Sequence, residues 1–266
     1  MVATVLSMEA LAGLGLLLLV VVVIRIVQIY RDIQHNRIHT SNPLLEGIKG
    51  HQRTKPCKTM VVLGSGGHTS EMLHMVQQLD ASLYRPLIFV VAATDHTSVR
   101  RLEATLPATA CTGTSTGAGA TEDAKKHTIY TIPRSREVGQ SYISSLGTTL
   151  YALVHAIGLT IRIRPELLLC NGPGTCVPLV MGAWILRICG FPCKFVFCES
   201  YCRVQTLSLS GRLLYPMVDC FFVHWESLQE KYPLTYRLST FVDGKNNDGS
   251  ESKTTGPSSK QQKKEQ

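Results

Sequence analysis

The sequence predicts an α/β fold, with a Rossmann-like parallel sheet preceded by one transmembrane helix. From residue 59 onward, short apolar runs rich in β-branched side chains alternate with longer segments of helical periodicity. This alternation is typical of a parallel sheet joined by right-handed crossovers. In front of it, residues 5–29 are almost wholly apolar, and about 20 such residues cross a bilayer. The 266 residues therefore provide one domain of ordinary size behind an anchor.

The N-terminal apolar segment predicts a membrane anchor at residues 1–30. It carries no charge from Ala10 to Ile24. A cleaved signal peptide is the alternative, but such a peptide needs a basic start and a small-residue cleavage site, and this segment has neither. Basic residues follow the segment, so the positive-inside rule predicts a cytosolic domain.

Residues 31–58 are predicted to form a basic juxtamembrane linker. Between residues 25 and 58, seven Lys and Arg stand against two acidic side chains. A basic stretch beside a span favours anionic lipid headgroups. The linker contains no Phe, Tyr or Trp, the residues that stack on bases in single-stranded nucleic acid. We therefore expect a membrane as partner and no nucleic acid.

The nine cysteines predict free thiols rather than disulfides or a metal site. Their number is odd and most lie inside apolar runs, as buried thiols of a reducing compartment do. Cys189, Cys193, Cys198 and Cys202 are candidate zinc ligands, but their spacing lacks paired C-x-x-C motifs. We expect no metal.

The domain is predicted to occupy residues 59–242, followed by a disordered polar tail over 243–266. Its first helix is expected to be capped by Thr69 or Ser70. Residues 104–127 are rich in Gly, Thr and Ala and predict a surface loop. Strands are expected at 59–63, 87–92, 128–132, 167–170, 194–198 and 218–223, and further helices at 141–162 and from 176 to about 188.

A glycine-rich loop between the first strand and the first helix predicts phosphate or pyrophosphate binding. Gly64, Gly66 and Gly67 let the backbone turn tightly and bring N–H groups to a helix N-terminus. A plain tight turn is the alternative. The loop departs from the dinucleotide fingerprint, because Thr69 stands in place of the third glycine. Asp95 can still hold a ribose, so a membrane-tethered NAD(P)-dependent reductase is a second hypothesis.

Several charged side chains follow predicted strands, where ligands bind in such sheets. His68 can act as a general base or phosphate donor, or be a loop histidine held by local hydrogen bonds. Glu199 can orient a hydroxyl or act as base, or it can pair with Arg203. Arg134 and Arg136 can clamp an anionic group or lie on a solvated face.

Four segments in a fixed order resemble one family. They are 64–69 (GSGGHT), 132–138 (IPRSREV), 169–178 (LCNGPGTCVP) and 199–208 (ESYCRVQTLS), followed by Trp225 and 231–233 (KYP). Over residues 59–233 the chain resembles the membrane-anchoring subunit of the eukaryotic UDP-N-acetylglucosamine transferase of asparagine-linked glycosylation. The resemblance implies a GT-B glycosyltransferase split between two chains. This chain would be the acceptor-side, N-terminal half, similar to that of the bacterial lipid II synthase.

The resemblance also implies a soluble partner chain that brings the UDP-GlcNAc site. Together the two chains would add the second GlcNAc, β1,4-linked, to GlcNAc-pyrophosphoryl-dolichol. The reaction would take place at the cytosolic face of the endoplasmic reticulum, or of the nuclear envelope membrane. This chain alone would be inactive, and it would need no cofactor. A non-catalytic recruiter is the third hypothesis.

Site residues follow from the same resemblance. His68 or Glu199 would deprotonate the attacking sugar hydroxyl. No metal is needed where backbone dipoles and cations stabilise the departing UDP. The acceptor pyrophosphate would be bound by Gly64, Ser65, Gly66, Gly67, Thr69, Arg134, Arg136, Asn171, Gly172, Gly174 and Thr175.

The C-terminal end departs from the family pattern. Relatives end soon after the Lys-Tyr-Pro segment with a short apolar stretch that holds the soluble subunit. Here residues 234–242 are followed by the polar tail. The tail is either a lineage addition or a variant ending that impairs partner binding.

Overall fold

A parallel sheet forms the centre of the domain and confirms the predicted α/β class. The computed structural model describes residues 2–39, 55–106, 127–133, 142–172 and 174–238. Within them, seven strands pair in parallel throughout, in the order β3-β2-β1-β4-β5-β6-β7. The strands are β1 (Thr59–Val62), β2 (Leu87–Ala92), β3 (Thr128–Ile132), β4 (Leu167–Asn171), β5 (Lys194–Cys198), β6 (Cys220–Val223) and β7 (Tyr236–Arg237).

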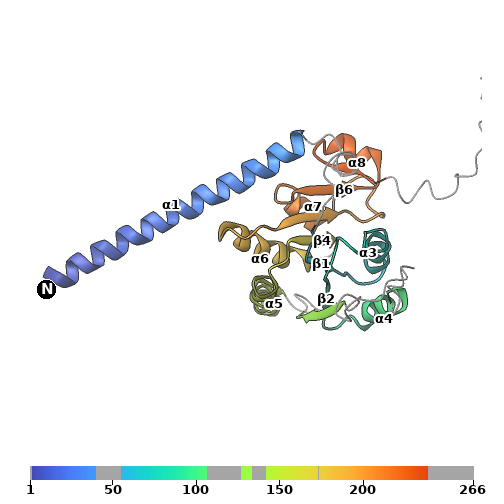
Figure 1. Ribbon diagram of the computed structural model, residues 1–266, viewed down its shortest axis with the longest axis horizontal. Helices are drawn as coiled ribbons and strands as arrows, with labels where there is room; N and C mark the ends of the chain where they lie inside the picture. Colours follow the sequence, from blue (N-terminus) through green and yellow to red (C-terminus); the bar gives the residue numbers. More distant parts are fainter. Residues whose placement is uncertain (1, 40–54, 107–126, 134–141, 173, 239–266) are drawn as a thin grey trace, which may run out of the picture.

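Helices cover both faces of the sheet (Figure 1). Helices α3 and α4 lie on one face, and α5, α6 and α7 lie on the other. The bounds are α3 (Gly67–Gln77), α4 (His96–Thr105), α5 (Tyr142–Ile163), α6 (Cys176–Ile188), α7 (Leu209–Leu214) and α8 (Glu226–Lys231). This is the Rossmann-like, two-sided cover that alternating strands and helices predict.

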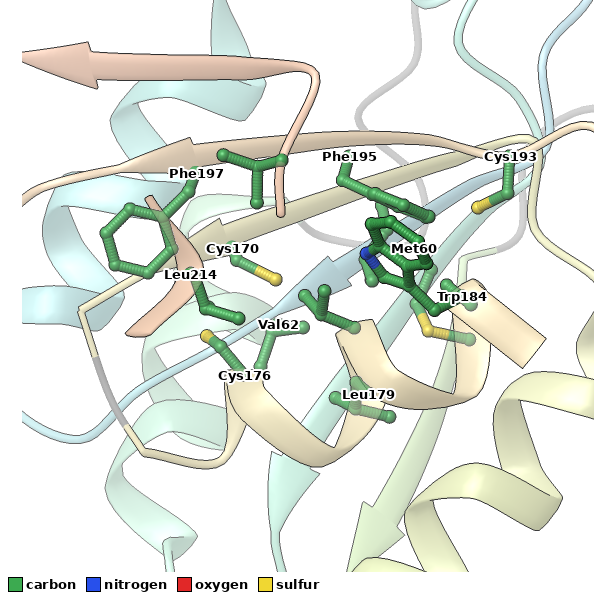
Figure 2. Packing of buried hydrophobic residues seen from close by; sticks show 14 of the residues in the cluster. Met60, Val62, Cys170, Cys176, Leu179, Trp184, Cys193, Phe195, Phe197 and Leu214 are labelled. Carbon is green, nitrogen blue, oxygen red and sulfur yellow. The ribbon is translucent and has the colours of Figure 1, made fainter. Parts of the chain in front are cut away.

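Alternation of side chains along the strands divides the core into two layers. In β1, Met60 and Val62 face the α5 and α6 side, whereas Val61 faces α3 and α4. Figure 2 shows the first of these layers, in which Trp184 of α6 lies beside Phe195 of β5. These large side chains are almost completely buried, and each contributes roughly 1.5–3 kcal/mol by leaving water.

Helix α1 (Val2–His39) is one unbroken helix that ends against the domain. Its apolar side chains from Leu11 to Val27 are largely exposed, and the helix is long and apolar enough to cross a membrane. Near its C-terminus, Ile29, Ile33 and Arg37 are buried at a spacing of four residues. The helix therefore continues past residue 30, the predicted end of the anchor, because these side chains find partners in the domain.

Some local predictions differ from the structure. Helix α3 begins at Gly67, before the predicted caps Thr69 and Ser70, and Gly66 is its N-cap. Helix α4 begins at His96 in a segment whose few apolar residues give little periodicity. Helices α7 and α8 and strand β7 span too few residues to show a period. The tail 243–266 and most of the predicted loop 104–127 lie outside the described residues.

The chain reverses its course across the sheet between β1 and β4. From β1 it proceeds outward through β2 to β3, and α5 then returns it to β4, the other neighbour of β1. In a doubly wound sheet such a switch point leaves a crevice outside the carboxyl ends of the two strands, where ligands bind.

Candidate functional site

The segments after β1, β4 and β5 meet at the carboxyl edge of the sheet. The three strands are neighbours, with Val61 opposite Leu169 and Asn171 opposite Cys198. Side-chain hydrogen bonds then join the segments that follow them. The structure therefore brings together His68, the 171–175 loop and Glu199, which the sequence places at separate strand ends.

Two helix N-termini without side-chain caps lie at this edge of the sheet. Helix α3 starts after Gly66 and α6 after Thr175, and neither residue caps its helix with a side-chain hydrogen bond. By contrast, Asp95 caps α4 and Ser208 caps α7. The buried hydroxyl of Thr175 has no hydrogen-bond partner among the described residues. Free N–H groups and the positive ends of two helix dipoles favour an anion at this edge.

The glycine loop exposes its backbone, whereas the side chains of Thr69 and Asp95 make hydrogen bonds within the protein. Ser65, Gly66 and Gly67 are exposed. The buried hydroxyl of Thr69 donates to the carbonyl of Gly64, so this side chain holds the loop in shape. The carboxylate of Asp95 accepts the N–H of Ser98 at 3.1 Å as a helix cap. That engagement weakens the case for a ribose at Asp95.

His68 extends from the first turn of α3 across the switch point to β4. Its Nδ1 lies 3.1 Å from Oδ1 of Asn171. Its ring lies against Gly172, which has a φ of +61°. The side chain keeps 34% of its surface exposed, so a ligand can reach the ring from solvent.

Glu71, one turn after His68 on α3, is a functional candidate that no sequence motif singles out. Its Oε2 accepts a hydrogen bond from Asn171 Nδ2 at 3.0 Å and lies 3.8 Å from His68 Nδ1. Its Oε1 accepts from Ser200 Oγ at 3.1 Å and from the N–H of Tyr201 at 3.3 Å. One carboxylate thereby joins the segments after β1, β4 and β5. The i, i+3 spacing from His68 is the sequence signal that points to it.

His68 and Glu71 change each other's protonation. The Glu71 carboxylate raises the pKa of His68 above its usual 6.5, against the opposing effect of burial. Burial alone would raise the pKa of Glu71, but the nearby imidazole of His68 and the hydrogen bonds from Asn171 and Ser200 outweigh it and lower that pKa below 4.5. The carboxyl edge of the sheet thus holds an ionised carboxylate beside an imidazole whose pKa is above its ordinary value.

Glu199 is buried where β5 ends, and its carboxylate is fully engaged. Oε1 accepts the N–H of Ser200 at 3.0 Å, and Oε2 accepts the N–H and the hydroxyl of Ser208 at 2.8 and 3.0 Å. Gly211 approaches so closely that a β-carbon there would overlap Oε2. The pairing with Arg203 is absent from the ion pairs of the described residues. These contacts fix the turn between β5 and α7.

A further cation reaches the glycine loop. Arg134 and Arg136 lie outside the described residues. Arg101 of α4 donates to the carbonyl of Gly66 at 2.8 Å and to the hydroxyl of Ser70 at 2.9 Å. Its exposed guanidinium therefore adds positive charge beside the uncapped end of α3.

The four candidate zinc ligands do not form a metal centre. Within the described part of the chain, no group of three or more His, Cys, Asp or Glu side chains could hold a metal ion. Cys193 and Cys198 are buried free thiols. Burial raises the pKa of Cys193 to about 12, so this thiol stays protonated and acts as a small apolar side chain.

Comparison with known proteins gives the family. The family described as "Oligosaccharide biosynthesis protein Alg14 like" matches residues 59–241. The chain belongs to this family. The match begins at β1 and includes the segments after β1, β4 and β5, so the whole candidate site lies inside the Alg14-like domain.

Relatives of this Alg14-like chain are named UDP-N-acetylglucosamine transferase subunit ALG14. The protein from Mus musculus is 43% identical over 186 residues, which is 70% of this chain and 83% of the relative. The one from Homo sapiens is 41% identical over 184 residues, 69% and 82% of the two chains. The one from Yarrowia lipolytica is 39% identical over 177 residues, 66% and 77%. Among solved structures, MurG from Acinetobacter baumannii is 14% identical with a TM-score of 0.44, covering 62% of this chain and 40% of that one.

Proposed function

We propose that this chain is the membrane-anchored, acceptor-binding subunit of a two-chain UDP-N-acetylglucosamine transferase, one half of a split GT-B enzyme. The complex adds the second GlcNAc, β1,4-linked, to GlcNAc-pyrophosphoryl-dolichol. It works at the cytosolic face of the endoplasmic reticulum and of the continuous nuclear envelope membrane. The observation that carries the proposal is the family match over residues 59–241, together with relatives named as subunits of this transferase.

The exposed apolar part of α1 supports an anchor for such a subunit. The polyprenyl tail of the acceptor stays in the bilayer. A domain held at the membrane meets this acceptor by a two-dimensional search, and it raises the local concentration of a soluble partner there.

The acceptor pyrophosphate binds at the two loops of the switch point. The uncapped N-termini of α3 and α6 supply N–H groups and favourable helix dipoles. The hydroxyl of Thr175, which has no hydrogen-bond partner among the described residues, offers a further donor, and Arg101 offers a positive charge. Arg134 and Arg136, which follow β3 in the sequence, are expected to bind the same anion.

His68, rather than Glu199, is the base in this mechanism. The ring of His68 is partly exposed beside the proposed pyrophosphate site, whereas the Glu199 carboxylate is buried and accepts three hydrogen bonds. As the acceptor hydroxyl attacks the anomeric carbon of UDP-GlcNAc, its proton passes to the imidazole. The bond from that carbon to UDP breaks, and the configuration inverts.

The donor site comes from the soluble partner, so activity should require both chains. The purified full-length chain is expected to show no transfer from UDP-GlcNAc to a GlcNAc-pyrophosphoryl-polyprenol acceptor until the soluble subunit is added. Full activity from the single chain would refute the two-chain proposal. Co-purification with the partner, with and without residues 243–266, tests whether the tail impairs assembly.

A matched pair of variants tests the catalytic role. In the assembled complex, His68→Gln should lower kcat about 10²–10⁴-fold, the usual contribution of a general base. His74→Gln changes an exposed histidine of the same helix and should leave kcat unchanged. Full activity of His68→Gln would favour the non-catalytic recruiter. Fluorescence titration with NADPH tests the reductase hypothesis. A reductase must bind this cofactor, so the absence of any fluorescence change would exclude it.

A further inference from the structure

The hydrogen bonds around Asn171 form a chain with a fixed direction. An ionised carboxylate only accepts hydrogen bonds, so Glu71 Oε2 must face the NH2 group of the Asn171 amide, 3.0 Å away. The carbonyl oxygen of the same amide then faces His68 Nδ1 at 3.1 Å. Because an amide oxygen only accepts, Nδ1 must carry a proton. In the neutral ring, Nε2 is then left with its lone pair.

We propose that Glu71 is a positioning residue that sets the tautomer of His68 through the Asn171 amide, leaving Nε2 as the basic atom of the site. The inference rests on the proposed function only in one respect, which is that Nε2 accepts the proton of the acceptor hydroxyl. The orientation of the amide follows from the contacts alone. Asn171 is fully buried, so water does not compete for its amide.

The two oxygens of Glu71 have different partners, so replacing one oxygen by an NH2 group, as in Glu71→Gln, tests the proposal. In Glu71→Gln, the oxygen of the new amide keeps its place as acceptor for Ser200 Oγ and for the N–H of Tyr201. The new NH2 group then faces the NH2 of Asn171. Two donors cannot bond, and the remaining contact of Asn171 Nδ2, with the carbonyl of His68, is long at 3.5 Å. The Asn171 amide therefore turns over and presents its NH2 to His68 Nδ1. Nδ1 becomes an acceptor, and the proton moves to Nε2.

A second change should reverse the first. In the double variant Glu71→Gln, Asn171→Asp, the amide introduced on α3 donates to one oxygen of the carboxylate introduced on β4, and the other oxygen accepts the Nδ1 proton. The pair keeps its total charge, and the original tautomer returns. Asn171→Asp alone should also keep the original tautomer, although it alters the residue in direct contact with the ring. A purely structural role for Glu71 does not produce this order of effects.

The tautomer is read directly by nitrogen NMR of the full-length chain, labelled with ¹⁵N-histidine, at a pH where the imidazole is neutral. His68→Gln identifies the signal. We expect an unprotonated Nε2 in the wild-type chain and in Asn171→Asp, a protonated Nε2 in Glu71→Gln, and an unprotonated Nε2 again in the double variant. Glu103→Gln, an exposed change on α4, is the control and should alter nothing. An unprotonated Nε2 in Glu71→Gln would overturn the inference.

Activity of the assembled complex supplies the second reading. Glu71→Gln should lower kcat about 10²-fold or more, as loss of a general base does, while KM for the acceptor stays within about twofold because binding contacts are retained. The double variant should recover most of kcat. If the tautomer switches and returns as expected while kcat never changes, the inference stands and His68 is not the base. A wild-type tautomer with protonated Nε2 overturns the inference, whatever the activity.

Discussion

The imidazole of His68 lies directly against the backbone of Gly172. A β-carbon built on Gly172 would come within 2.6 Å of His68 Nδ1. Gly172 also holds a φ of +61°, a conformation that other residues adopt only with strain. The close approach follows from one requirement, which is that a ring starting on α3 reaches the Asn171 side chain at the end of β4.

Gly172→Ala should therefore remove activity by displacing His68. The added methyl group cannot fit beside the ring, so His68 loses its contact with Asn171 and the base is misplaced. Strain at this φ costs a further 1–2 kcal/mol or so. We expect kcat of the complex to fall at least about tenfold, with a lower melting temperature. Gly158→Ala, where a β-carbon meets nothing within 4 Å, is the control and should keep full activity. A fully active Gly172→Ala enzyme would contradict the packing of His68 as a functional contact.

The pH dependence of activity should follow the pKa of His68, which Glu71 raises. Since Glu71 raises the pKa of His68 above 6.5, and since only the neutral ring accepts a proton, kcat/KM should rise with pH through a midpoint above 6.5. In Glu71→Gln this midpoint should move to lower pH, because the main cause of the shift is gone. A pH–rate profile of the two complexes measures both values. Equal midpoints would argue against their coupling.

The free energy of unfolding should depend on pH through the same pair, and His68 and Glu71 should change it in opposite directions as pH rises. The raised pKa of His68 means that its contribution is present below pH 6.5 and is lost as pH rises through the native value. The lowered pKa of Glu71 means that its contribution is present above pH 4.5 and is lost as pH falls through the native value. Chemical unfolding between pH 4 and 8 should show smaller pH slopes for Glu71→Gln than for the wild-type chain.

The sequence predicts the strands and the glycine loops well for a physical reason. Buried parallel strands are continuous apolar runs, and tight loops need glycine, so both are visible locally. The predicted strand 128–132 coincides with β3 (Thr128–Ile132). The role of Glu71 is not visible, because its partners Asn171 and Ser200 lie 100 and 129 residues away. Thr69 shows the opposite case. Its residue type predicts a helix cap or a phosphate ligand, but its hydroxyl donates a hydrogen bond to the carbonyl of Gly64.

We expect Glu199 to stabilise the fold rather than to take part in catalysis. Its three hydrogen bonds are charge-assisted and buried. Glu199→Gln leaves one of the facing N–H groups opposite a donor, so it should cost about 2–4 kcal/mol of the free energy of unfolding. Glu226→Gln removes an exposed pair with Arg237 and should cost less than about 1 kcal/mol. Thermal unfolding of the two variants compares these costs. An inactive Glu199→Gln complex with wild-type stability would instead make Glu199 a catalytic group.

Arg37 should hold α1 to the domain. It is buried in the last turns of the helix and donates to the carbonyl oxygens of Tyr215 at 2.5 Å and of Leu234 at 2.6 Å. Its guanidinium also lies 4.7 Å from the ring centre of Tyr215. Arg37→Ala leaves two carbonyl groups unpaired, which costs about 1–3 kcal/mol for each. Local opening of the helix end should become more frequent as a result.

Hydrogen exchange of the full-length chain measures this opening. Amides of residues 33–39 should exchange faster in Arg37→Ala by about 10-fold or more, the factor that corresponds to at least about 1.4 kcal/mol, while the strands β1 and β4 keep their protection. Arg31→Ala changes an exposed arginine of the same helix and should leave the exchange of these amides as it is. If both variants exchange alike, the contacts of Arg37 do not hold the helix. The buried side chains of Ile29 and Ile33, with the hydrogen bonds that Arg25 and Gln34 donate to the carbonyls of Arg187 and Pro216, then attach the anchor to the domain.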